Sequence, residues 1–338
     1  MSPGLPAVTV LIPSLNEERD IRGCLETVAA QTYPAELLDV LLVDGCSDDA
    51  TVDVARLTAA GLGLDLRVIE NPRRRTSTSL NAGLDRVRGE IVVRLDARSR
   101  VQPDYVERCV GVLAERPDVG VVGGRQVPRP RSAALTDRGI GRALSNRYTT
   151  GFARYRRAPQ AGPTDTVWMG VFRADDLREL GGWDDEVALN EDWALNRRYR
   201  DHDRLVWFEP ELVSGYLPRT DLRSLARQHF YFGRVKGLWW VRGMKPEARQ
   251  VAMLAAPPIA GLGLLGLARR RGARVLLAVP LVLLVADAVG SDGPADPGER
   301  AVSASAIGVY SAAWWVGTVV GAVGELLGVE HRHRSAPR

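Results

Sequence analysis

The stretch that decides the fold is LDVLLVDGCSDDAT, residues 38–51. Its apolar run leads straight into Asp44 and a turn of glycine, serine and aspartate, which is typical of a buried strand that ends in a loop. Similar runs occupy residues 7–12, 64–71 and 90–99, and helical patterns occupy residues 18–34, 51–61 and 76–89. Gly61 and Gly89 are the expected ends of the last two helices. This alternation predicts an α/β chain with parallel strands and right-handed crossovers.

Polar residues stand at the carboxyl ends of three of these predicted strands. They are residues 13–17 after the first strand, Asp44 after the second and Asp96 after the fourth. In an open parallel sheet, ligands bind in the crevice outside the carboxyl ends of the strands. These three groups are therefore expected to line one site.

Composition describes a globular protein: 338 residues, 45% apolar, 25% charged, with a net charge of +4. No basic stripe with interleaved aromatic residues indicates nucleic-acid binding. The preference for arginine suits a phosphorylated ligand or an anionic membrane, or simply reflects genome composition. The three cysteines show no zinc or disulfide spacing, which indicates a reducing compartment. The start, MSPGLPAVTV, lacks the pattern of a signal peptide, so the first region is expected in the cytoplasm.

Beyond Arg249 the sequence changes into long uncharged stretches. The apolar segments are 251–268, which two prolines interrupt, 275–286 and 301–324. Three in succession favour membrane association. If the first is an interfacial hairpin, the chain crosses outward at 273–290 and returns at 301–324, with the arginines of 269–274 inside. The predicted parts are a cytoplasmic domain (1–245), membrane-associated helices (246–330) and a basic tail (331–338).

Several motifs occur in the order seen in one enzyme family. They are VTVLIPSLNEE (8–18), LLVDGCSDDAT (41–51), NPRRRTSTSLNAGL (71–84), GEIVVRLDARS (89–99), GGWDDEVALNEDW (181–193) and RQHFYFGR (227–234). About the first 240 residues resemble family 2 of the inverting glycosyltransferases, closest to bacterial exopolysaccharide enzymes of the succinoglycan-biosynthesis type. The resemblance implies the GT-A fold of nucleotide-diphospho-sugar transferases, a Rossmann-like and mostly parallel sheet, here followed by C-terminal membrane-associated helices.

The resemblance also assigns donor-binding residues. Asp44 would lie against the nucleotide, although Gly45 takes the place of a second acid, and an Asx-turn is the alternative explanation. Arg75, with two neighbouring arginines as competitors, and Asn81 belong to a loop and helix amino terminus of the kind that binds diphosphate. The full donor set is Pro13, Asn16, Glu17, Asp44, Arg75, Asn81, Asp96 and Arg98.

Asp96 is the expected metal ligand. A divalent cation, Mg2+ or Mn2+, would bridge the leaving diphosphate, and one protein carboxylate can hold it when phosphate and water oxygens complete the shell. A metal-dependent relative would carry a second acid two residues later, where this chain has Arg98. Arg98 either contacts the diphosphate or is a surface residue turned away.

The NEDW motif supplies the expected catalytic acids. By resemblance, Asp192 is the general base for the acceptor hydroxyl and Glu191 helps to place the acceptor. The alternative is the ordinary preference of acids for a helix amino terminus. By resemblance, Trp183 is expected to stack on a sugar, with a core position as the alternative because tryptophan is more often buried. Gln228 and Arg234 are expected to close over the diphosphate. RQHFYFGR departs from the Q-x-x-R-W motif of processive members, which favours addition of a single sugar.

The predicted function is inverting transfer of a hexose, glucose from UDP-glucose, to a saccharide carried on a polyprenyl diphosphate. This step would belong to exopolysaccharide or cell-envelope glycan synthesis, with the catalytic domain on the cytoplasmic face of the inner membrane. Two alternatives stay open: direct transfer to a polyprenyl phosphate, and a non-catalytic, membrane-anchored protein that binds nucleotide sugars.

Overall fold

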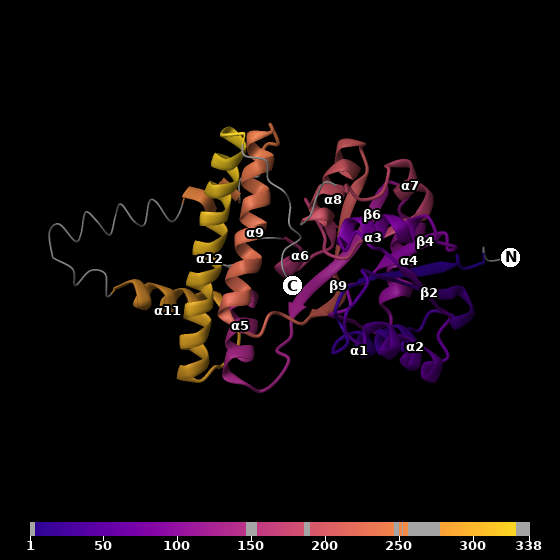
Figure 1. Cartoon of the computed structure of the whole chain (residues 1–338), viewed down its shortest axis with the longest axis horizontal. Helices are drawn as coiled ribbons and strands as arrows, with labels where there is room; N and C mark the ends of the chain where they lie inside the picture. The colour runs from indigo at the N-terminus through magenta and orange to yellow at the C-terminus, as the bar shows by residue number, and fades with distance from the viewer. Residues whose placement is uncertain are drawn as a thin grey trace. The chain divides into compact units, whose positions relative to one another are not determined.

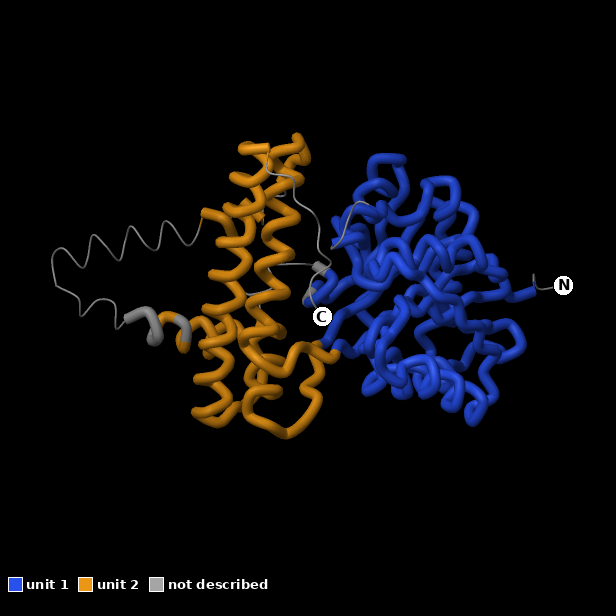
Figure 2. Tube along the Cα trace, viewed as in Figure 1, with its two compact units in different colours: residues 1–127, 154–216 blue, residues 128–153, 217–338 orange. Residues whose placement is uncertain are grey.

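The computed structural model describes residues 4–146, 154–185, 190–246, 250–251, 253–255 and 278–328. The chain divides into two compact units (Figure 2). The first unit comprises residues 1–127 and 154–216, and the second comprises residues 128–153 and 217–338. Residues 128–153 and 217–245, which were predicted to belong to the first region, are therefore part of the second unit.

The described part of the first unit contains one mixed sheet of nine strands, in the order β3-β2-β1-β4-β8-β6-β9-β5, with β7 beside β9. The strands are β1 (Val8–Ser14), β2 (Leu38–Asp44), β3 (Leu66–Glu70), β4 (Ile91–Arg94), β5 (Ser99–Val101), β6 (Val119–Pro128), β7 (Gly162–Pro163), β8 (Val171–Arg173) and β9 (Leu205–Tyr216). The predicted parallel pairing holds for β3, β2, β1 and β4. In contrast, β8 is antiparallel to β4 and β6, and β5 and β7 are antiparallel to β9.

Helices cover both faces of this sheet (Figure 1). They are α1 (Ile21–Ala29), α2 (Thr51–Leu62), α3 (Thr76–Leu84), α4 (Tyr105–Glu115), α6 (Arg154–Arg157), α7 (Ala174–Glu179) and α8 (Glu191–Asp201), with a short 3-10 helix, η1 (Ala35–Leu37). Residues alternate along β1: Val8, Val10 and Ile12 join the core beneath α1 and α4, whereas Leu11 joins the core beneath α3, α7 and α8. Burial on both faces explains the continuous apolar runs in the sequence.

Two helix ends differ from the prediction. Helix α2 continues past Gly61, and Gly63 takes the left-handed cap with φ 70°, a conformation that favours glycine. Helix α3 ends five residues before Gly89. The amide of Gly89 donates to Thr9 Oγ1 at 2.9 Å, and an added Cβ would lie 2.6 Å from the Thr9 nitrogen. Gly89 therefore permits close approach to β1 rather than ending a helix.

The second unit is helical in its described residues. Its helices are α5 (Leu135–Ser145), α9 (Leu222–Val241), α11 (Ala278–Gly290) and α12 (Pro297–Leu326). Among the described residues, α12 is the helix long and apolar enough to cross a membrane. The predicted segment 251–268, apart from 251 and 253–255, lies outside the described residues, as do the arginines of 269–274 and the tail 331–338.

Candidate functional site

The carboxyl ends of β1 and β2 are joined through Asp44. Its Oδ1 accepts from Ser14 Oγ at 3.1 Å, and its Oδ2 accepts from the Ser47 amide at 2.7 Å. The side chain is buried, with 2% of the residue exposed. Asp44 thus shapes the turn between β2 and α2, as the turn explanation expects, and its contact with a nucleotide stays a prediction. Pro13 lies within β1 opposite Val43.

The loop after β1 is fastened to the same turn. The Asn16 amide donates to Ser47 Oγ at 2.9 Å, and Asn16 Oδ1 accepts from the Asp48 amide at 2.9 Å. The Glu17 amide donates to Thr51 Oγ1 at 2.8 Å, at the start of α2. These bonds hold Asn16 in a left-handed conformation with φ 56°. Both loops therefore form one continuous rim at the edge of the sheet.

Arg98 ties the segment after β4 to that rim. Its Nε donates to Glu17 Oε2 at 2.8 Å and lies 3.7 Å from Asp20 Oδ2. Only 20% of its side chain is exposed. Arg98 is therefore a partly buried, ion-paired residue rather than a surface residue turned away.

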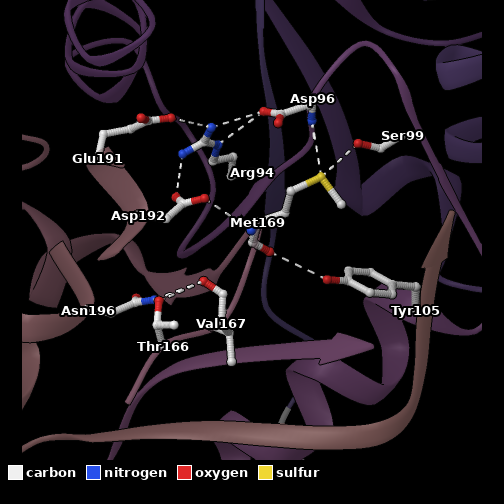
Figure 3. A network of polar contacts seen from close by, with 10 residues as sticks. All are labelled: Arg94, Asp96, Ser99, Tyr105, Thr166, Val167, Met169, Glu191, Asp192 and Asn196. Carbon is white, nitrogen blue, oxygen red and sulfur yellow. Dashed lines mark hydrogen bonds and ion pairs between the residues drawn. The ribbon is translucent and has the colours of Figure 1, made fainter. Parts of the chain in front are cut away.

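Arg94, the last residue of β4, is the centre of a cluster of carboxylates (Figure 3). Its Nη2 contacts Asp96 Oδ1 at 3.0 Å and Glu191 Oε1 at 2.8 Å, and its Nη1 donates to Asp192 Oδ1. The side chain is only 2% exposed. Burial alone would lower the pKa of Arg94, but the three carboxylates outweigh it and raise that pKa above its usual range. Arg94 thus brings the two predicted catalytic acids and the predicted metal ligand together.

Asp192 has the protonation behaviour of a base that works near neutral pH. Burial raises its pKa to about 7; Glu191 and Asp96 add to the rise, and Arg94 opposes it. A base is most effective when its pKa lies near the working pH. Both acids belong to the first turn of α8, which follows Asn190 in a left-handed conformation with φ 64°.

Met169 connects this cluster to the neighbouring elements. Its sulfur accepts from the Asp96 amide at 3.3 Å and from Ser99 Oγ at 2.7 Å, and its own amide donates to Asp192 Oδ2 at 3.4 Å. Its backbone has φ 53°, an unusual value for a side chain without local polar groups. The sequence analysis missed both Met169 and Arg94. For Arg94 the signal was an arginine inside an otherwise apolar strand.

Asn81 and Arg75 form hydrogen bonds with other residues of the protein. Asn81 Nδ2 donates to the Trp183 carbonyl at 2.6 Å and to Asp185 Oδ1 at 2.7 Å, while its Oδ1 accepts from the Trp183 amide at 2.8 Å. Arg75 Nη1 donates to the Asp185 carbonyl at 3.4 Å. Both residues therefore anchor the segment 183–185 to α3, and their donor contacts stay predictions.

The prediction that Trp183 stacks on a sugar does not fit its position. Its side chain is 1% exposed and packs edge-on against Phe172, with ring centroids 5.7 Å apart. A ring enclosed in this way offers no face to a ligand, so Trp183 is a core residue. Gln228 and Arg234 lie on α9 in the second unit, and their roles stay predictions.

Asp96 offers a cation a single protein carboxylate. Its side chain is 32% exposed, one of its oxygens accepts from Arg94, and Arg98 stands two residues later. In the part of the chain that the structure describes, no three His, Cys, Asp or Glu side chains are grouped to hold a metal. These residues fit a divalent cation only if oxygens of the donor diphosphate and water complete its shell.

The sequence matches a known protein family. The model named "Glycosyl transferase family 2" matches residues 9–181. Succinoglycan biosynthesis protein ExoA of Rhizobium meliloti is 28% identical over 258 residues, covering 74% of this chain and 76% of ExoA. Glycosyltransferase AglE of Haloferax volcanii is 34% identical over 245 residues, covering 71% and 76%.

A solved structure is similar over nearly the whole chain. It is the mannosyltransferase PcManGT from Pyrobaculum calidifontis, in complex with GDP-Man and Mn2+. It superposes with a TM-score of 0.64 at 24% identity, covering 96% of this chain and 88% of PcManGT. The fold of this chain is therefore the GT-A fold, with a mixed sheet.

Proposed function

The chain belongs to glycosyl transferase family 2, and on that premise we propose that it moves one hexose from a nucleoside-diphosphate sugar to a lipid-linked acceptor, with inversion. The observation that carries the proposal is the cluster of Asp96, Glu191 and Asp192 around the buried Arg94. It supplies a base with a pKa near neutrality beside a carboxylate that could hold a divalent cation for the donor diphosphate. The finer proposal is UDP-glucose as donor.

Asp192 is the proposed general base. It takes the proton of the acceptor hydroxyl as that oxygen attacks the anomeric carbon, on the face opposite the departing diphosphate. Attack from that face inverts the anomeric configuration. Glu191, held by the same guanidinium at 2.8 Å, is proposed to accept a hydrogen bond from a second acceptor hydroxyl.

Asp96 is the proposed ligand for Mg2+ or Mn2+. When bound, the cation would neutralise the charge that develops on the leaving diphosphate. Arg98 is proposed to donate to a diphosphate oxygen on the same side, because its side chain is held at the rim of the sheet by Glu17. The rim residues Pro13, Asn16, Glu17 and Asp44 are proposed to face the nucleotide.

The proposed acceptor is a saccharide on a polyprenyl diphosphate, at the cytoplasmic face of the membrane. ExoA is named for succinoglycan biosynthesis, and the exposed apolar faces of α11 and α12 support a location at a lipid surface. Direct transfer to a polyprenyl phosphate is the competing outcome. Chromatography of the labelled product distinguishes them, because that reaction gives a phospholipid with one sugar.

Replacing the base tests the proposal directly. With radiolabelled UDP-glucose and lipid-linked acceptors, Asp192→Asn is expected to lower transfer by roughly 100-fold or more, as for loss of a general base. Binding of UDP-glucose, followed by thermal shift, should change little. Asp201→Asn, an exposed acid at the other end of α8, is the matched control. Wild-type turnover by Asp192→Asn would remove Asp192 as the base.

A further inference from the structure

Helices α9 and α12 of the second unit lie side by side and run in the same direction (Figure 1). In the first half of α9, the rings of His229 and Tyr310 are 3.9 Å apart between centroids. Beyond the end of α9, Arg242 Nε bonds Glu325 Oε1 at 2.8 Å. Later residues of α9 contact later residues of α12, so the two helices are parallel. Helix α9 packs along most of the apolar part of α12.

Glycines bring the two backbones into contact. Gly233 and Gly237 of α9 face Gly317 and Gly321 of α12, and both pairs have four-residue spacing. A Cβ added at any of them would lie 2.0 Å from a carbonyl oxygen of the opposite helix. These oxygens belong to Trp314, Thr318, Phe230 and Arg234, respectively. Such close packing fixes the register of the pair, and the two helices must take the same position relative to a membrane.

Charged residues on α9 oppose a transmembrane position. The helix has 20 residues, a length of about 30 Å, which equals the hydrocarbon thickness of a bilayer. If α12 crossed the membrane, α9 would cross beside it. Arg234 and Lys236 would then lie within about one or two turns of the midpoint of α9, and Arg227 within the same span. Cations at that depth are strongly disfavoured.

Two further features indicate which kind of surface the second unit contacts. Most of its exposed large apolar residues among those described form stripes on α11 and α12: Val282, Leu284, Val285, Val289, Val316, Val319, Val320 and Val323. The sequence of this unit contains 21 Lys and Arg against 9 Asp and Glu, a formal charge of +12 in a chain of net +4. Apolar stripes with excess basic charge fit the interface of an anionic leaflet.

We propose that the second unit binds an anionic lipid leaflet from one side, with the apolar faces of α11 and α12 in the acyl region, and that α12 does not cross the membrane. This differs from the two crossings that hydropathy alone favoured. It rests on the membrane location in the proposed function and specifies its geometry. Both ends of α12 should then face the same compartment as the catalytic unit.

Cysteine labelling of the full chain tests this geometry. Pro294→Cys and Leu327→Cys place exposed thiols at the two ends of α12, in a Cys46→Ser background. Cys24 and Cys109 can stay, because burial raises the pKa of Cys24 to about 12 and raises that of Cys109 well above its usual value. An impermeant maleimide should label both positions in inverted inner-membrane vesicles and neither in intact spheroplasts. Labelling of either position in spheroplasts overturns the inference.

Vesicle binding tests the lipid partner independently. The purified chain should sediment with phosphatidylcholine vesicles that contain phosphatidylglycerol, and Arg223→Glu with Arg227→Glu should weaken this binding roughly tenfold or more. The matched control is Arg56→Glu with Arg88→Glu, an equal charge change at exposed positions of the first unit, which should bind like the wild type. Equal losses in both variants would contradict a specific contribution of the second unit's basic residues to lipid binding.

The two experiments separate this inference from the proposed function. If the wild-type chain does not bind the vesicles that contain phosphatidylglycerol, both the membrane location and the inference fail. If it binds, but one end of α12 is labelled from the opposite side, only the one-sided geometry fails. Transfer activity in solution with a short-chain acceptor, measured on the same preparations, tests the catalytic proposal apart from either result.

Discussion

The two units each bury an arginine among acceptors, but the two clusters differ in charge balance. In the second unit, Arg142 Nε bonds both oxygens of Asp287, at 3.0 and 3.1 Å, and its Nη1 donates to the carbonyls of Asp292 and Gly293. Asp287 also accepts from Ser303 Oγ. The Arg142 cation is paired with the single Asp287 anion, and both side chains form further hydrogen bonds. This arrangement is typical of a structural ion pair.

The cluster around Arg94 is unbalanced. One guanidinium meets three carboxylates, so negative charge remains when all three are ionised, and the pKa of Asp192 is raised to about 7 by burial and by its acidic neighbours. This excess gives the site capacity for a proton or a cation. The difference indicates that a buried arginine with an excess of carboxylates belongs to a functional site, whereas an arginine matched by one carboxylate has a structural role.

The same contrast extends to the whole units. The first unit contains 24 Lys and Arg against 32 Asp and Glu, a formal charge of −8, whereas the second carries +12. The overall abundance of arginine therefore does not indicate a basic donor site. The first unit offsets its arginines with a larger number of acids, so the positive net charge of the chain comes from the second unit, where it would suit the proposed anionic membrane surface.

Replacing each buried arginine in turn should give the largest difference in transfer rate between the two clusters. Arg94→Met is expected to lower transfer per folded molecule by roughly 100-fold, because Asp192 and Glu191 lose the group that positions them. Arg142→Met should leave that rate near the wild-type value. Both should lose stability by roughly 3–5 kcal/mol, since each leaves buried carboxylates without their partner. Initial rates normalised to the folded fraction, with denaturant titrations, measure both quantities.

A conservative variant sharpens this test. Arg94→Lys keeps a cation but not the fork that reaches three carboxylates, so partial recovery of the rate is expected relative to Arg94→Met. Equal rates per folded molecule in Arg94→Met and Arg142→Met would show that Arg94 is as purely structural as Arg142.

The parallel half of the sheet could be predicted from sequence because its strands are continuous apolar runs that end in polar loops. The antiparallel half was not predicted. Strands β7 and β8 have only two and three residues, too few for a periodic pattern, whereas β6 and β9 have ten and twelve residues and were overlooked. The acids of NEDW and Asp96 were found through motifs. Arg94 was missed because its role depends on carboxylates that come from α8, nearly 100 residues later in the chain.

Trp183 shows the converse limit. Its segment resembles a family motif, which suggested a ligand site, but tertiary packing places it against Phe172 in the core. Burial of a single aromatic residue depends on which elements meet there, and neither composition nor spacing contains that information.

Asp96→Ala tests the next largest effect, the capacity for a cation. Mn2+ is expected to increase the thermal shift caused by UDP-glucose in the wild type, and this increase should be lost in the variant, with donor affinity in Mn2+ lower by roughly tenfold. Asp85→Ala, an exposed acid after α3, is the control and should keep the Mn2+ effect. An unchanged Mn2+ response in Asp96→Ala would remove Asp96 as the ligand.

The raised pKa of Asp192 predicts a smaller, pH-dependent effect. In the proposed mechanism Asp192 must be ionised to take the proton, so kcat/KM should rise about tenfold per pH unit below about 7 and level off above it. Glu191 adds to this raised pKa, and Glu191→Gln should therefore move the rising limb to lower pH. A limb that stays in place in Glu191→Gln would contradict the assignment.

Stability should show the same ionisation with the opposite trend. The folded carboxyl of Asp192 holds its proton up to about pH 7, whereas the unfolded chain releases it near pH 4. The stability associated with this group is therefore fully present below about pH 4 and is lost as pH rises towards 7. Thermal unfolding of the free protein should show this decline, and Asp192→Asn should remove it.

The smallest expected effect is that of Arg98 on UDP binding. Arg98→Ala should weaken UDP binding without metal by roughly three- to tenfold if the guanidinium donates to the diphosphate. The same loss would follow indirectly if Arg98 only holds the loop after β1 through Glu17. Glu17→Gln separates these cases by calorimetry, because it weakens the ion pair but keeps the guanidinium. Equal losses in both variants indicate loop positioning, whereas a loss confined to Arg98→Ala indicates direct contact with the diphosphate.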